Sequence, residues 1–98
     1  MAGYSTSNPP SLIAGGIGAG GTTCPRIWSY ASVDAVSVVR VTGYFTNGYA
    51  LGMRAGDLVL VLDNDASPLT GSWCWVATAT SSAVDLGDGV TITGTNSD

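Results

Sequence analysis

The hydrophobic residues of this chain fall in short runs that are typical of β-strands. Residues 58–62 are apolar at every position, which predicts a strand buried inside a sheet or between subunits. Residues 72–79 form a second apolar stretch, and we expect it to pair with 58–62 across the polar turn between them. Residues 27–30, with a Trp and a Tyr, predict a shorter strand.

The best helix candidate is residues 33–42. Ser32 is placed as an N-cap, Asp34 falls in the first turn where the helix dipole favours an anion, and Gly43 follows as a C-terminal cap residue. The valines of this segment favour a strand by intrinsic propensity, but stop signals at both ends favour a helix. After it, residues 46–48 read as a turn and 51–57 as a loop.

Near the C-terminus, residues 83–86 and 90–93 flank the Asp-Gly pair of 87–89, which predicts a β-hairpin. The expected fold is therefore mainly β with one short helix. It would be a small β-roll or partly open barrel of four or five strands.

Residues 1–23 differ from the rest, because Gly, Ser, Thr, Pro and Ala dominate them without hydrophobic periodicity. This composition predicts an extended or flexible arm in front of a compact β-rich domain at residues 24–98. A few apolar anchors could order the arm along a neighbouring chain; they are Pro9, Pro10, Leu12, Ile13 and Ile17. The Gly-rich part of the arm lacks the Lys of a phosphate-binding loop, since the chain contains none.

Charge is scarce. Charged residues make up 10% of the chain, against about 25% in typical soluble domains. Three Arg and seven Asp give a net charge of −4, so no basic patch exists for nucleic acid or an anionic membrane. A surface so poor in charge is either covered by other protein or kept soluble by Ser, Thr, Asn and Gly, and we favour the covered surface.

The residue types needed for catalysis are largely missing. His, Lys and Glu are absent, so acid–base chemistry would fall to Asp, Cys or Tyr. Asp63 and Asp65 are best interpreted as a solvated turn rather than a catalytic pair or calcium loop. Cys24 and Cys74 lack a basic partner that would form a thiolate; whether they form a disulfide stays open. We expect no enzyme activity, no cofactor and no metal, with a small hydrolase as the weakest alternative.

Aromatic residues point to protein contacts. Trp73 and Trp75 lie two apart and share one face of a strand, where they would fill a core or subunit interface or, alternatively, form a sugar-binding platform. The predicted core and interface residues are Trp28, Tyr44, Phe45, Val59, Val61, Trp73 and Trp75.

A pattern across residues 28–62 carries a resemblance. It consists of Trp28, Tyr30, Ser32 and Asp34, then Gly43-Tyr44-Phe45, then Leu51 and Gly56-Asp57 before the apolar strand. It resembles small proteins encoded with the head genes of tailed bacteriophages, which are often capsid decoration (cement) proteins or head fibres, and many of which are trimers.

The resemblance implies a structural virion protein on the capsid exterior. Its partners would be the major capsid protein and copies of itself, as a trimer, with the arm contacting the capsid or the next subunit. The acidic balance of the chain agrees with a position away from packaged DNA. The alternative is a receptor- or glycan-binding module of a head or tail fibre.

Overall fold

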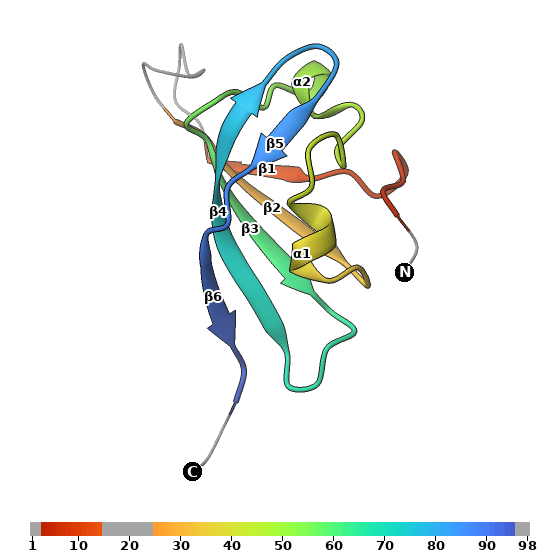
Figure 1. The fold of residues 1–98 in the computed structure, drawn as a ribbon, viewed down its shortest axis with the longest axis vertical. Helices are drawn as coiled ribbons and strands as arrows, with labels where there is room; N and C mark the ends of the chain where they lie inside the picture. Colours follow the sequence, from red (N-terminus) through yellow and green to blue (C-terminus); the bar gives the residue numbers. More distant parts are fainter. Residues whose placement is uncertain (1–2, 15–24, 96–98) are drawn as a thin grey trace.

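The computed structural model describes residues 3–14 and 25–95. This part of the chain contains six strands and two short helices (Figure 1). The strands are β1 (Ser11–Ala14), β2 (Ile27–Ser32), β3 (Leu58–Asp63), β4 (Thr70–Ala79), β5 (Val84–Leu86) and β6 (Val90–Thr93). The helices are α1 (Val36–Val39) and α2 (Gly48–Leu51). The predicted mainly-β class is confirmed, and the sheet is open and unclosed.

The sheet has the order β1-β2-β3-β4-β5, with β6 also paired to β4. β2 and β3 are parallel, and the other neighbours are antiparallel. A parallel pair needs a long crossover connection, and the segment between β2 and β3, which carries both helices, provides it. The strands expected at 27–30, 58–62 and 72–79 are all present, and the predicted pairing of the last two is confirmed.

The hairpin predicted around residues 87–89 is wrong. β5 and β6 do not pair with each other: both run antiparallel to β4, β5 along Val76–Ala79 and β6 along Thr70–Trp73. They therefore follow one another in the same direction along one edge of β4. We call the connection between β5 and β6, residues 87–89, the step, because the chain continues through it in the same direction. A Gly with positive φ suits such a connection as well as a hairpin turn, and Gly89, at φ +72, lies in it.

The predicted helix at 33–42 is much shorter in the structure, covering only Val36–Val39. Its N-cap is Ala35, without a side-chain hydrogen bond. Ser32 instead ends β2 and accepts a hydrogen bond from the backbone N–H of Asp34, 3.1 Å away. β-Branched valines lose rotamer freedom in a helix, so the local signals support little more than one turn. Gly43 has φ +85 but lies three residues beyond the C-cap Arg40.

Helix α2 was not predicted. We expected a turn at 46–48 and a loop at 51–57, and α2 spans Gly48–Leu51 between them. The helix starts at a Gly, a poor helix former, and ends at Gly52, whose φ of +116 is a left-handed C-cap. Gly48 is nevertheless required at its place: a Cβ there would lie 2.9 Å from the Val84 side chain and 3.0 Å from Met53 Sδ.

The hydrophobic core draws its side chains from β2, β3, β4 and β5, from α1 and from the segments on either side of α2. It consists of Trp28, Tyr30, Val39, Phe45, Met53, Val59, Val61, Cys74, Val76, Val84 and Leu86. The rings of Tyr30 and Phe45 in the core and those of Tyr4 and Tyr44, which pack against it, meet at centroid distances of 4.9–6.1 Å. Most of these contacts are edge-to-face, the geometry that aromatic pairs prefer.

Residues 3–14 do not lie apart from the domain as the expected arm would. β1 extends the sheet by pairing antiparallel with β2, and Tyr4 packs against the core and donates a hydrogen bond to Asn47. Pro10 is buried. The composition of the segment gave no sign of this docking, because the docked side chains are scattered among small residues.

Candidate functional site

The two faces of the sheet are covered very differently. Side chains alternate between the faces along each strand, and the registers place the odd positions of β2 beside the even positions of β3. One face carries the core. The other carries three rows of side chains: Ile27, Leu58 and Trp75; Ser29, Leu60, Trp73 and Val90; and Ala31, Leu62, Gly71 and Ile92. We call this second surface the open face.

Apart from Gly71, which is buried and has no side chain, every residue of the open face is half-buried or exposed. The leucines of β3 and Trp73 are half-buried between their neighbours, whereas Trp75 is 59% exposed, Val90 69% and Ile92 46%. The helices and Tyr4 contact the opposite face through the core cluster. A contiguous apolar surface of this kind on a protein marks an interaction site.

A shallow hollow of about 210 Å³ lies at one end of the open face. Its lining includes Leu60, Leu62, Leu69, Gly71 and Ile92. Gly71 is held against β3 so closely that a Cβ would lie 2.6 Å from the carbonyl oxygen of Val61. Gly71 therefore has to be Gly for β4 to pair this closely with β3, and it adds no side chain to the lining of the hollow.

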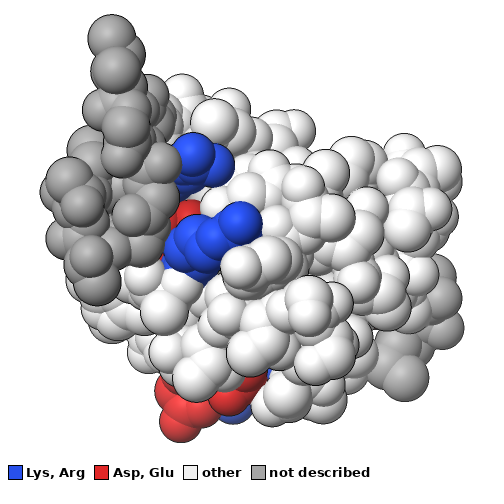
Figure 2. All heavy atoms as spheres, turned by 90° about the horizontal axis from the view of Figure 1, so that it is seen from above, with Lys and Arg blue, Asp and Glu red and all other residues white. Residues whose placement is uncertain are grey.

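The open face contains no charged residue, as the three rows show. Asp63, at the end of β3, belongs to the alternate set that points to the other side. Figure 2 shows a surface that is mostly uncharged in that view, with acidic and basic side chains confined to small groups. A partner that covers the open face would thus remove apolar area from water without desolvating an ion.

The buried carboxylates of the described chain have structural partners. Asp57 is fully buried and accepts hydrogen bonds from Trp28 Nε1 at 3.0 Å and from the backbone N–H groups of Arg26 and Arg54 at 3.1 Å. These bonds join the start of β2 to the turn before β3. Every buried side-chain nitrogen and oxygen of the described residues has a hydrogen-bond partner, and the bonds of Asp57 tie these two segments together.

Asp34 lies in a second polar group beside the aromatic cluster. It is 1% exposed and accepts a hydrogen bond from Tyr44 Oη at 2.7 Å, and Tyr44 Oη is 2.9 Å from Tyr30 Oη. Burial, together with the hydrogen bonds to Tyr30 and Asp34, raises the pKa of Tyr44 above its ordinary value. Tyr44 therefore stays protonated and acts as a hydrogen-bond donor to the carboxylate.

The structure separates the predicted core and interface residues into two groups. Trp28, Phe45, Val59 and Val61 are buried in the core, and Tyr44 packs against it. Trp73 and Trp75 share one face, as expected, and it is the open face.

Of the predicted arm anchors, Leu12 and Ile13 are 49% and 58% exposed in β1, Pro9 is exposed and Pro10 is buried. Ile17 lies outside the described residues, as does Cys24. Cys74 is a buried free thiol that contacts Ser72 Oγ at 3.5 Å.

Sequence reasoning missed the role of residues 58, 60, 62, 90 and 92 as one surface. The apolar run of β3 predicted burial on both sides, but only a sheet register shows which of its residues lie beside Trp73 and Trp75. In the part of the chain that the structure describes, no three potential metal ligands come together, and no helix has the length and hydrophobicity needed to cross a membrane.

Comparison of this chain with protein families, with characterised proteins and with solved structures found no match.

Proposed function

We propose that this chain is a structural bacteriophage virion protein that binds the outer capsid surface, as a homo-oligomer, and stabilises the junctions between capsomers. The observation that carries this proposal is the open face: an uncharged, apolar sheet surface with an exposed indole at Trp75. The resemblance of residues 28–62 to small phage head proteins supplies the virion context. Binding by such a surface needs shape and apolar area but no catalytic group.

Trp75 is the residue from which a partner gains most. An indole side chain offers about 250 Å², and 59% of Trp75 is exposed, which leaves about 150 Å² to be covered. At about 25 cal/mol per Å², covering it contributes about 3–4 kcal/mol. Central aromatic residues of this kind commonly dominate the binding energy of an interface.

The test uses phage heads assembled without this chain, to which purified protein is added and the bound fraction measured by sedimentation. Trp75→Ser should weaken binding more than tenfold, because a tenfold change corresponds to about 1.4 kcal/mol. Val41→Ser is the matched control: Val41 is 57% exposed but follows α1, off the sheet. Equal binding by both variants and the wild type would contradict a role for the open face.

A second candidate is glycan binding by a head or tail fibre, which an exposed Trp75 also favours. The neighbour of Trp75 on β3, however, is Leu58, and the adjacent rows of the open face are mainly aliphatic. A sugar site needs polar side chains around the aromatic ring to bind hydroxyl groups. The fibre function would be supported if the wild-type protein bound host polysaccharide but not phage heads, and if Trp75→Ser lost the binding to polysaccharide.

Copy number distinguishes the two functions independently of any variant. Quantitative mass spectrometry of purified virions should find hundreds of copies of a decoration protein. A handful of copies per virion would indicate a fibre or tail component.

A further inference from the structure

Strand β6 is an open edge of the sheet. Among the described residues it pairs only with β4, and all four of its side chains are exposed. The outer side of β6 therefore presents backbone groups that have no strand beside them in the described chain. Such an edge is a template for another strand.

The ladder shows which backbone groups face outward. The N–H of Gly94 donates to the carbonyl oxygen of Leu69 at 2.6 Å. Hydrogen-bonded and non-hydrogen-bonded pairs alternate in an antiparallel ladder, so Ile92 and Val90 are the residues bonded to β4. Thr91 and Thr93 consequently direct their N–H and C=O groups away from β4.

The β6 edge lacks the features that usually prevent strand addition. Its sequence, Val-Thr-Ile-Thr, has no charge, no Pro and only residues that favour strands. The opposite edge, β1, is different: Pro9 and Pro10 precede it, and its register shifts between Leu12 and Ala14. Irregular, Pro-flanked edges resist pairing, so β6 is the edge suited to a partner.

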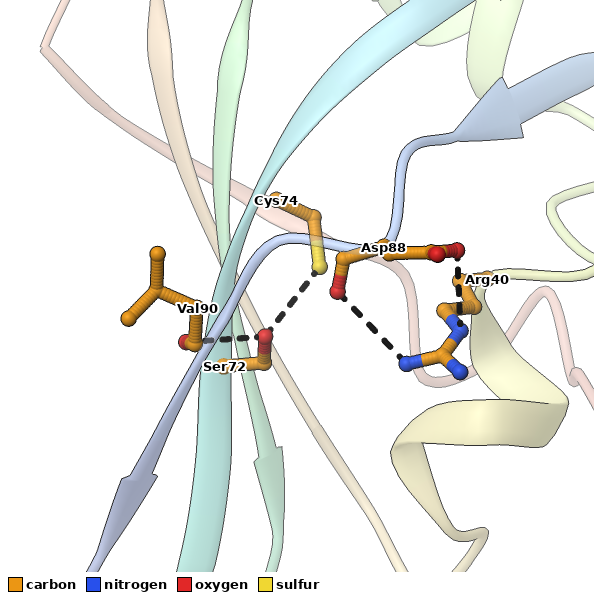
Figure 3. Close-up of polar contacts among 5 residues, drawn as sticks. All are labelled: Arg40, Ser72, Cys74, Asp88 and Val90. Carbon is orange, nitrogen blue, oxygen red and sulfur yellow. Dashed lines mark hydrogen bonds and ion pairs between the residues drawn. The ribbon is translucent and has the colours of Figure 1, made fainter.

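The start of β6 is fixed by the step that joins it to β5 (Figure 3). Ser72 Oγ donates to the carbonyl oxygen of Val90 at 3.0 Å, and Arg40 binds Asp88 through an ion pair of 3.7 Å and a 3.5 Å hydrogen bond to its carbonyl oxygen. Gly89 passes so close to β4 that a Cβ would overlap the carbonyl oxygen of Trp73. The edge is therefore held in the plane of the sheet.

The geometry points to a second copy of this chain as the occupant, with the two β6 strands antiparallel about a two-fold axis perpendicular to the sheet. Only a register that centres Ile92 on the axis pairs Thr91 of each copy with Thr93 of the other and so bonds all the outward groups. It also sets the two Ile92 side chains side by side. In this register the outward N–H and C=O groups of one β6 strand pair with those of the same residues in the second copy. A partner of different sequence would not need this symmetry.

The dimer would carry the two open faces on the same side, because a two-fold axis perpendicular to a sheet does not turn it over. The apolar surface would then continue from one copy to the next through Val90 and Ile92. This inference goes beyond the proposed function and does not depend on a capsid. It replaces the trimer that the resemblance implies with a two-fold contact.

Thr91→Pro is the first test, since Pro removes the outward N–H but leaves the bonds of β6 to β4 intact. Sedimentation equilibrium at micromolar concentrations should find a wild-type dimer, and Thr91→Pro should raise the dissociation constant at least tenfold with an unchanged far-UV spectrum. A wild-type monomer at 100 μM would overturn the inference. A trimer that Thr91→Pro leaves intact would overturn it as well.

Cross-linking tests the register in a Cys24→Ser background. Ile92→Cys places two thiols in a non-hydrogen-bonded pair with Cα atoms about 4.5 Å apart, close enough for a disulfide. Val90→Cys is the control, because the two Cys residues would lie about 13 Å apart along the strands. Oxidation should yield a covalent dimer only with Ile92→Cys; equal yields from the two variants would refute this register.

Capsid binding separates failure of the dimer from failure of the proposed function. A Thr91→Pro monomer that still binds heads through Trp75 keeps the proposed function while confirming the site of self-association. A protein that dimerises as described but does not bind heads retains the dimer and loses the virion function.

Discussion

The step between β5 and β6 is the most demanding point of the backbone, and Gly89→Ala tests it. Gly89 has φ +72, a conformation that residues with a Cβ rarely adopt. The added methyl group would overlap the carbonyl oxygen of Trp73 and lie 2.9 Å from both Cys74 Sγ and Ser72 Oγ. Backbone and core would both have to move to accommodate it.

The magnitude follows from two separate costs. A left-handed conformation costs a residue with a Cβ about 1–2 kcal/mol. Forcing an extra methyl group into a packed site costs about 1–3 kcal/mol more. We therefore expect Gly89→Ala to lower the free energy of unfolding by about 2–5 kcal/mol, a large part of the ~5–15 kcal/mol that stabilises a typical domain.

Gly87→Ala is the matched control at the other end of the same step. A Cβ there meets only the Trp75 carbonyl oxygen, at an ordinary 3.8 Å, and Gly87 is not among the glycines with positive φ. Where the backbone already suits Ala, the exchange stabilises by about 0.4–1 kcal/mol through the unfolded state. Gly87→Ala should therefore be neutral or slightly more stable than the wild type.

Urea unfolding followed by tryptophan fluorescence measures both variants, at one fixed protein concentration because self-association would add to the apparent stability. The midpoint of Gly89→Ala should fall clearly below that of Gly87→Ala. Coincident midpoints for the two variants would show that the chain does not pass close to β4 at Gly89, and the described path from β5 to β6 would be refuted.

Four further predictions concern the interior and the N-terminal strand. Trp28→Phe removes one donor from the buried Asp57 carboxylate and should lower the free energy of unfolding in urea by about 1.5–3 kcal/mol. Tyr44→Phe removes the donor to Asp34, with a loss of about 1–3 kcal/mol by the same assay.

The folded state also raises the pKa of Tyr44 above the ordinary 10.0, so the unfolded chain alone loses this proton as the pH rises past about 10. Wild-type stability should fall there, and less steeply in Tyr44→Phe. Deletion of residues 1–14 removes β1 and the ring of Tyr4, which packs against the core, and should lower the melting temperature, whereas deletion of a free arm would leave it unchanged.

Local patterns predicted a strand correctly where the residues that favour a strand are also the residues that the strand buries. The apolar run at 58–62 and the aromatic stretch at 72–79 form β3 and β4, whose Val59, Val61 and Val76 side chains are buried in the core. Their pairing followed from the short polar turn between them. The same patterns gave the mainly-β class.

The helix and the hairpin were mispredicted because their signals have more than one structural use. Ser32 resembled an N-cap but ends β2, and its hydroxyl binds the next turn instead. The Asp-Gly pair at 88–89 resembled a hairpin turn but makes a step along β4. In both cases long-range strand pairing decided between local options of similar free energy.

The sequence by itself determined that this protein is mainly β, poor in charge and without the usual groups of acid–base catalysis, because these properties depend on residue types and short-range periodicity. Only the tertiary structure decided where the apolar excess lies. Whether Leu58, Trp75 and Ile92 form one surface depends on the register of three strands that are distant in the chain, and a shift of one residue would send each to the opposite face. That register is fixed by core packing and by contacts such as those of Gly71 and Gly89, which no local pattern records.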